Sequence, residues 1–224
     1  MSDEKYSPDR RPINSRNHPL AVQTASWLAQ RGATPNGIST AGMFAGIAGG
    51  LCFWGTSATG IVGDWVETVC FILAAVCMQL RLQANMYDGM VAIQTKQASP
   101  VGELYNEVPD RVSDTAFFVG AGYAAGGIPE LGYLAAIAAL FTAYVRAEGK
   151  VAGAPQDYCG PMAKQHRMAV LTVAAVYAGM VPTSWQPQLG SGGVISIALL
   201  VIVVLGGYTT VRRLARTVKM LKQG

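Results

Sequence analysis

The chain has 224 residues, of which 51% are hydrophobic and only 13% are charged. Soluble domains carry about 25% charged residues, so this composition excludes a disordered chain and argues against nucleic-acid binding. The net charge of +4 is modest, and the 26 glycines are typical of helices that pack closely in lipid. We therefore expect an all-α membrane protein.

The first expected element is a short amphipathic helix within residues 17–32, ahead of the first apolar segment. Leu20, Trp27, Leu28 and Arg31 would lie along the membrane surface on such a helix. A plain polar leader is the alternative interpretation of the same residues.

Six apolar segments follow, and each is long enough to cross a hydrocarbon core of about 30 Å at about 1.5 Å per residue. They span residues 39–57, 64–95, 104–126, 129–147, 166–183 and 191–211. We expect six transmembrane helices that form one domain over residues 39–211. A cytoplasmic arm, 1–38, would precede this domain, and a basic cytoplasmic tail, 212–224, would follow it.

The basic residues predict the orientation in the membrane. All 17 Lys and Arg fall on one side of the six-span arrangement, if Arg81 and Arg111 lie at helix ends that face that side. The three opposite turns, 57–64, 126–130 and 183–193, contain none. By the positive-inside rule we expect a multi-pass protein of the cell membrane with both termini in the cytoplasm.

The second segment ends in a polar stripe. At 100° per residue, Asn85, Asp88, Gly89 and Ala92 share one helix face, and Arg81 lies on the same face one turn earlier. Ionisable groups at membrane depth are costly and mark functional sites. The alternative, a solvated polar connection, explains Lys96 but not the acidic groups inside apolar helices.

The third segment carries a second stripe. Asn106, Asp110 and Asp114 are four residues apart and share a face, and Glu103 and Glu107 lie close to it. Carboxylate and amide oxygens that face each other suit a hard divalent cation such as Mg²⁺. The two stripes together predict a metal or polar-substrate site on the cytoplasmic side.

These two stripes resemble the signature of the CDP-alcohol phosphatidyltransferases, D-x2-D-G-x2-A-R-x8-G-x3-D-x3-D. The spacing agrees at every step, and the residues at the signature positions are Asn85, Asp88, Gly89, Ala92, Ile93, Gly102, Asn106 and Asp110. The run from Asp110 to Asp114 is similar to the branch of the family that uses inositol phosphate. Thr34, Pro35 and Asn36 also resemble the family's Thr-Pro-Asn sequence before the first span.

The resemblance implies a two-metal site for Mg²⁺ or Mn²⁺ whose ligands are Asn85, Asp88, Asn106 and Asp110, and the two Asn residues leave open whether one or two metal ions bind. Asp110 would also be the catalytic base, while Gly89, Ala92, Gly102 and Asp114 would contact substrate. The chain departs from the family at three positions, with Asn at two of the four acidic positions and Ile93 in place of Arg. Two missing carboxylates predict weaker metal binding in the empty protein.

A second group of residues surrounds the connection between the fourth and fifth segments. Arg146, Lys164 and Arg167 either anchor the helices at the membrane surface or form a pocket for a phosphorylated acceptor. Both interpretations are compatible with the sequence.

The resemblance implies an integral membrane transferase of phospholipid biosynthesis, with a CDP-activated lipid and an alcohol acceptor as its partners in the membrane. It would transfer a phosphatidyl group and release CMP. Two alternatives remain: a weakened relative that binds nucleotide or lipid without turnover, and a small transporter. The sequence leaves open whether the chain forms a homodimer.

Overall fold

The computed structural model describes residues 14–57, 64–97 and 99–223. Within these ranges the chain forms seven α-helices, two short 3₁₀ helices and no β-strand. The α-helices are α1 (Pro19–Gln30), α2 (Pro35–Ser57), α3 (Asp64–Gln94), α4 (Pro100–Gly122), α5 (Pro129–Val151), α6 (Lys164–Met180) and α7 (Val194–Leu221), and the 3₁₀ helices are η1 (Asn14–Asn17) and η3 (Thr183–Trp185). The all-α prediction is confirmed.

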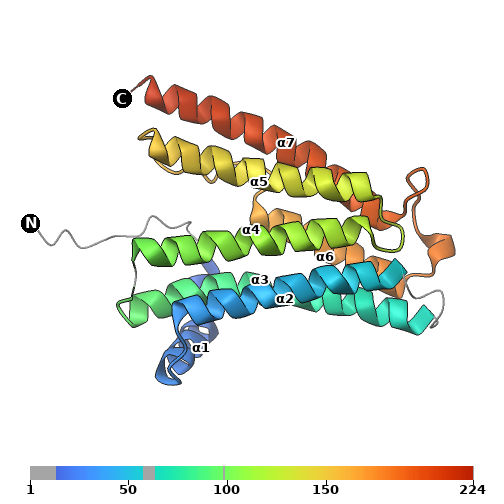
Figure 1. Ribbon diagram of the computed structural model, residues 1–224, viewed down its shortest axis with the longest axis horizontal. Coiled ribbons are helices and arrows are strands. Elements are labelled where there is room, and N and C mark those ends of the chain that lie inside the picture. Colours follow the sequence, from blue (N-terminus) through green and yellow to red (C-terminus); the bar gives the residue numbers. More distant parts are fainter. Residues whose placement is uncertain (1–13, 58–63, 98, 224) are drawn as a thin grey trace, which may run out of the picture.

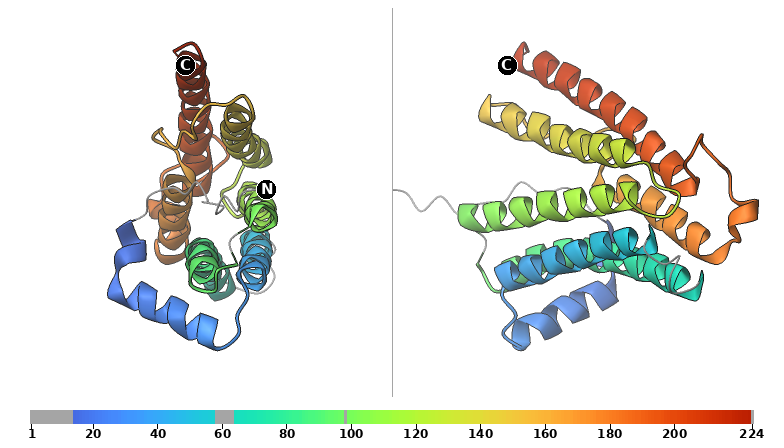
Figure 2. Two further views of the ribbon diagram at one scale, coloured as in Figure 1. Left: turned by 90° about the vertical axis from the view of Figure 1, so that its left-hand side faces the viewer. Right: turned by 45° about the vertical axis from the view of Figure 1, so that its right-hand side comes forward.

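The helices α2 to α7 run along the long axis of the molecule, and α1 lies outside this bundle beside the start of α2 (Figure 1). Helix α2 packs on α3 and α4, α4 also packs on α5, and α7 packs on α5 and α6. We call the end where α2 and α4 begin and where α3, α5 and α7 end the polar end. Figure 2 shows that α5 and α7 diverge from α4 toward this end.

Four helices are long and apolar enough to cross a membrane: α2, α3 from Trp65 onward, α5 and α7. Their outer faces expose large apolar side chains such as Phe44, Leu73, Ile137 and Val204, as lipid contact requires. The six predicted spans are thus supported for four helices. Helix α4 contains five charged residues and α6 has only 17 residues, so neither has the composition and length of an independent span.

Helices α2 and α4 approach each other closely where they cross. A Cβ atom added to Gly50 would collide with the backbone of Ala116, and one added to Gly120 would collide with the backbone of Gly50. The absence of side chains at these two positions lets the two backbones touch. This contact fixes the distance between α2, which begins at the polar end, and α4, which carries the second polar stripe.

The predicted boundaries agree with the structure to within a few residues, with two informative differences. Helix α2 begins at Pro35 because Thr34 caps it: its Oγ1 accepts a hydrogen bond from the N–H of Gly37 at 3.1 Å. Helix α7 continues without a break through residue 212 to Leu221. Residues 1–13 of the predicted arm and residues 58–63 of the predicted turn lie outside the described ranges.

The predicted amphipathic helix is present as α1. Ala21 and Ala25 are buried against Met90 and Val91 at the end of α3, and the opposite face exposes Leu20, Val22 and Trp27. An exposed apolar face beside the polar end suits a helix that lies at a membrane surface.

Candidate functional site

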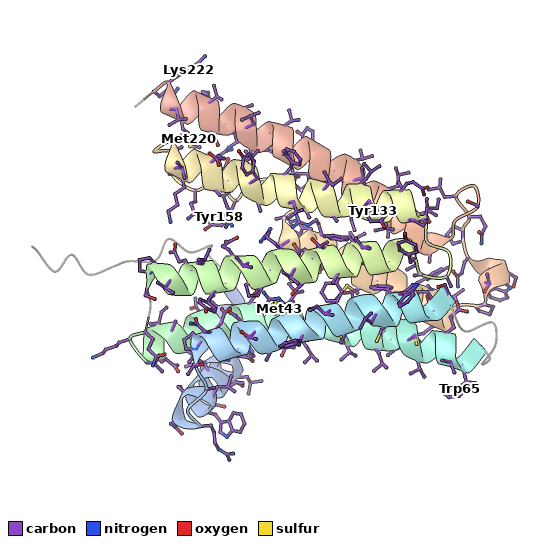
Figure 3. The ribbon with its side chains drawn as sticks, in the orientation of Figure 1. Met43, Trp65, Tyr133, Tyr158, Met220 and Lys222 are labelled. Atoms are coloured by element: carbon purple, nitrogen blue, oxygen red, sulfur yellow. The ribbon has the colours of Figure 1, made fainter. Side chains whose placement is uncertain are left out.

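The polar end contains a cavity of about 1500 Å³. Side chains from α2 to α6 line it, together with Arg213 of α7 and Tyr158 of the connection 152–163. Figure 3 shows Tyr158 in the space between α4 and α5. The predicted site residues Asn85, Asp88, Gly89, Ala92, Gly102, Asn106, Asp110, Arg146, Lys164 and Arg167 all line this cavity. The structure thus brings both polar stripes and the basic group together.

Two local features place the stripes opposite each other. Lys96, with φ of 56°, turns the chain after α3, and Ser99 caps α4 by accepting a hydrogen bond from the N–H of Gly102 at 3.1 Å. Pro100 at the start of α4 lacks the N–H that would otherwise need a partner there. The short connection therefore returns the chain antiparallel, with the second stripe facing the first.

Asp88 is the centre of the oxygen-rich wall. It is 3% exposed, and Oδ2 accepts a hydrogen bond of 2.5 Å from the hydroxyl of Ser39 in α2. Its Oδ1 and the Oδ1 of Asn85 are both buried and have no hydrogen-bond partner among the described residues. A buried carboxylate oxygen without a partner is costly, so this pair of oxygens fits a cation.

Asp110 has a different environment. Its Oδ1 accepts a hydrogen bond from Arg81 and lies 2.5 Å from Nζ of Lys164, and its Oδ2 lies 3.6 Å from Nη2 of Arg111. Protein cations therefore already surround the carboxylate that was predicted to be both a metal ligand and the base. Arg81 itself is fully buried within α3, so its predicted place at a helix end was wrong.

Asp114 lies behind the cavity wall rather than on it. It is 2% exposed, its Oδ2 accepts a hydrogen bond of 3.1 Å from Arg167, and its Oδ1 lies 3.6 Å from Nζ of Lys164. Arg167 also donates to the carbonyl of Met162 at 3.1 Å. Asp114, which was predicted to contact substrate, does not line the cavity and is paired with Arg167 and Lys164.

The basic wall faces the oxygen-rich wall. Arg146 donates to Glu107 at 2.5 Å, and its guanidinium lies 5.3 Å from the centre of the Tyr158 ring. Arg213 donates to the carbonyls of Cys159 and Thr142 at 2.8 and 3.1 Å. The sequence interpretation missed Arg213 because it ended the last span at 211. The continuing helical period of α7, which buries Thr209 and Arg213 four residues apart, is the signal that could have found it.

The connection 152–163 is fixed to α7 by a small polar cluster. Asp157 accepts hydrogen bonds from the N–H and the thiol of Cys159 and from Nε of Arg216, at 2.8, 3.1 and 2.7 Å. Burial alone would raise the pKa of Asp157, but these hydrogen bonds and the charge of Arg216 hold it below its usual value. Burial and the adjacent carboxylate raise the pKa of the Cys159 thiol, so Cys159 is protonated at neutral pH.

The donor set fits one divalent cation better than two. Among the described residues, no group of three or more His, Cys, Asp or Glu side chains is arranged to hold a metal ion. Asp88 and Asn85 offer unpartnered oxygens, whereas the oxygens of Asp110 already face three cations. Mg²⁺ commonly binds through one or two carboxylates, with substrate phosphates completing its coordination.

The sequence is similar to two bacterial proteins. It is 27% identical over 162 residues to phosphatidylinositol phosphate synthase from Streptomyces avermitilis, covering 70% of this chain and 62% of that protein. The chain thus spans less than two thirds of that relative. It is 23% identical over 183 residues to inner membrane protein YnbA from Escherichia coli strain K12, covering 81% of this chain and 86% of YnbA. No family model matches the chain.

The fold is that of a solved membrane enzyme. Phosphatidylinositol phosphate synthase (PgsA1) from Mycobacterium tuberculosis superposes with a TM-score of 0.69 at 17% identity, in a structure with CDP-DAG bound that covers 89% of this chain and 94% of that one. A second PgsA1 structure, in complex with manganese and citrate, superposes with a TM-score of 0.69 at 18% identity and covers 88% of both chains. Four apolar helices and these relatives together indicate a multi-pass membrane protein with the fold of PgsA1.

Proposed function

We propose that the chain is a CDP-alcohol phosphatidyltransferase that moves a phosphatidyl or related group from a CDP-activated lipid to an alcohol and releases CMP. The observation that carries the proposal is the cavity of about 1500 Å³, which has the buried oxygens of Asp88 and Asn85 on one wall and Arg146, Lys164, Arg167 and Arg213 among the basic side chains that line it. Such a cavity accommodates a nucleotide diphosphate and an anionic acceptor at the same time. The relatives with phosphatidylinositol phosphate synthase activity support the assignment.

We place the divalent cation, Mg²⁺ or Mn²⁺, on Asp88 and Asn85. A bound cation would neutralise the charge that develops on the departing CMP. The relative solved with manganese supports this choice of ion. Gly89 and Gly102, which lack side chains, leave room for the nucleotide beside the helix backbones, and Asn106 faces the same space.

Asp110 is the candidate base, and its ion pair with Lys164 has a consequence for the reaction. The acceptor hydroxyl must lose a proton as it attacks, and a carboxylate within hydrogen-bond reach can take it. Lys164 lies 2.5 Å from Asp110 and also lines the cavity. A phosphate on the acceptor would attract Lys164 and release Asp110 for the hydroxyl. This coupling favours a phosphorylated acceptor such as glycerol 3-phosphate or an inositol phosphate.

The proposed membrane arrangement has six spans, α2 to α7, with the cavity and both termini on the cytoplasmic side. The support is that α5, α6 and α7 bring Arg146, Lys164 and Arg213 to the same end as Lys96 and the C-terminus. A homodimer is compatible with the exposed apolar faces of the helices.

The test is CMP release by the purified full chain with CDP-diacylglycerol and Mn²⁺ or Mg²⁺. The acceptor panel pairs each phosphorylated alcohol with its unphosphorylated form: glycerol 3-phosphate with glycerol, and an inositol phosphate with inositol. We expect release that depends on the divalent ion and on one phosphorylated acceptor. No release with any acceptor, from protein that binds CDP, would instead support the second candidate.

The second candidate is a relative that binds the CDP-lipid without turnover. The observation that favours it is the engagement of Asp110. Its Oδ1 contacts both Arg81 and Lys164, and its Oδ2 lies 3.6 Å from Nη2 of Arg111, so protein cations already surround the candidate base in this conformation. A binding protein of this kind would retain CDP and the divalent ion but would not release CMP from the lipid.

A further inference from the structure

The guanidinium of Arg81 is buried inside the site, and its Nε and Nη1 have no hydrogen-bond partner among the described residues. It is 0% exposed in the interior of α3, and its Nη2 donates to Oδ1 of Asp110. Gly42 of α2 makes room for it, because a Cβ atom at that position would lie 2.6 Å from Nη1 of Arg81. A buried guanidinium must be paired, so Arg81 and Asp110 depend on each other.

Without a metal ion the site carries no excess of negative charge. Asp110 is paired with Arg81 and Lys164 and lies 3.6 Å from Arg111, and Asp114 is paired with Arg167 and Lys164. The two signature positions that could add negative charge are Asn85 and Asn106. Each divalent ion that enters therefore needs negative charge from outside the protein, because uncompensated charge is costly in a low dielectric.

The unpartnered oxygens of the cavity lining belong to Asp88 and Asn85, and not to Asp110. Asp88 forms no ion pair in the described part of the chain, and its Oδ1 and that of Asn85 lack hydrogen-bond partners. Asp110, in contrast, receives Arg81 and Lys164 on the same oxygen. The diphosphate of a CDP-linked lipid carries enough negative charge to balance one divalent ion, but not two.

We propose that the guanidinium of Arg81 serves as a permanent cation on the Asp110 side of the site, in place of a second metal ion. The site consequently takes one divalent cation, on Asp88 and Asn85, and the nucleotide diphosphate completes its coordination. The inference rests on the proposed function, since it assumes a CDP-linked ligand in the cavity. Arg81 is not a signature position and does not belong to the basic group of Arg146, Lys164 and Arg167, so neither feature predicts this role for it.

The experiment counts Mn²⁺ ions per chain by electron paramagnetic resonance during titration of the purified protein, with and without CDP. We expect one Mn²⁺ in the native protein. Asn85→Asp with Asn106→Asp should tighten Mn²⁺ binding while the count stays at one, because Arg81 is still present. Adding Arg81→Met to these two changes should raise the count to two and give the broadened spectrum of a coupled Mn²⁺ pair.

Two ions in the native protein or in the double Asp variant would overturn the inference. Both proteins retain Arg81, so they decide the question even if the Arg81→Met combination does not fold. A folded combination that still binds one ion would also overturn it. Arg216→Met removes a cation outside the cavity and should leave the count at one. The titration needs no turnover, so a failure of CMP release would reject the proposed activity and leave the ion count unaffected.

Discussion

Asp88 and Asp110 occupy signature positions of the same type, yet their surroundings give them different tasks. Asp88 is held by the hydroxyl of Ser39 and has an unpartnered oxygen, whereas Asp110 is surrounded by Arg81, Arg111 and Lys164. The proposed divalent ion would therefore depend mainly on Asp88, and the position of the cationic side chains depends mainly on Asp110.

Asp88→Asn should remove most Mn²⁺ binding and lower CMP release by about 100-fold or more, because the charge that holds the cation is lost. Calorimetry with Mn²⁺ and the CMP assay measure the two effects. Glu148→Gln is the matched control, because Glu148 is exposed on α5 and does not line the cavity. Near-native activity of Asp88→Asn would place the chemistry elsewhere in the chain.

Lys164→Gln should raise the KM for the phosphorylated acceptor much more than the KM for the CDP-lipid. Loss of one charge-assisted contact costs about 1.5–3 kcal/mol, or roughly 10- to 150-fold in KM. Steady-state kinetics with each substrate varied in turn separates the two constants. Lys219→Gln, at an exposed position on α7, is the control that should change neither. Equal increases for both substrates would favour an anchoring role.

At the scale of helices, the site depends on the contact between α2 and α4. Gly50 and Gly120 touch through their backbones, and this contact holds Ser39 and Asp88 on one side and Asp110 on the other at a fixed separation. A change at this crossing should therefore affect both stability and the geometry of the cavity.

Gly120→Ala should lower the unfolding free energy by about 1–3 kcal/mol, because the added methyl group forces α2 and α4 apart. Thermal unfolding in detergent measures the loss. Gly207→Ala on α7 is the control: a Cβ atom there meets nothing within 4 Å, and alanine favours helix over glycine by about 1 kcal/mol. A Gly120→Ala protein as stable as Gly207→Ala would show that the crossing is not tightly packed.

The sequence predicted the helices and the positions of the two stripes because both follow from local periodicity. Hydrophobic segments and the four-residue spacing of Asn106, Asp110 and Asp114 are properties of a single helix. Ion pairs between helices, in contrast, cannot be derived from the periodicity of a single helix. The pairing of Arg81 with Asp110 and of Glu107 with Arg146, and the role of Ser39, depend on how α2, α3, α4 and α5 pack against each other.

For the whole molecule, the proposal that α4 and α6 cross the membrane together with the four apolar helices can be tested directly. Whether six or only four helices cross, the C-terminus and residues 184–192 would lie on opposite sides of the membrane, so reporters there cannot separate the two arrangements. Trp65 and Tyr133 are exposed at the end of the bundle opposite Lys222, where aromatic side chains would meet the outer interface (Figure 3). The connection between α5 and α6 is the informative place.

A reporter inserted at Gly153 should remain cytoplasmic if six helices cross, and should be exported if only α2, α3, α5 and α7 cross. Gly153 suits an insertion, because it is exposed, has φ of 93°, and a Cβ atom added there would meet nothing within 4 Å. Reporters at the C-terminus and within 184–192 serve as the cytoplasmic and exported references. We expect the cytoplasmic result, since Arg146, Lys150 and Lys164 flank this connection and export would carry all three across the membrane. Export of the Gly153 reporter would contradict the six-span proposal and also the fold, in which α3, α5 and α7 all end at the polar end.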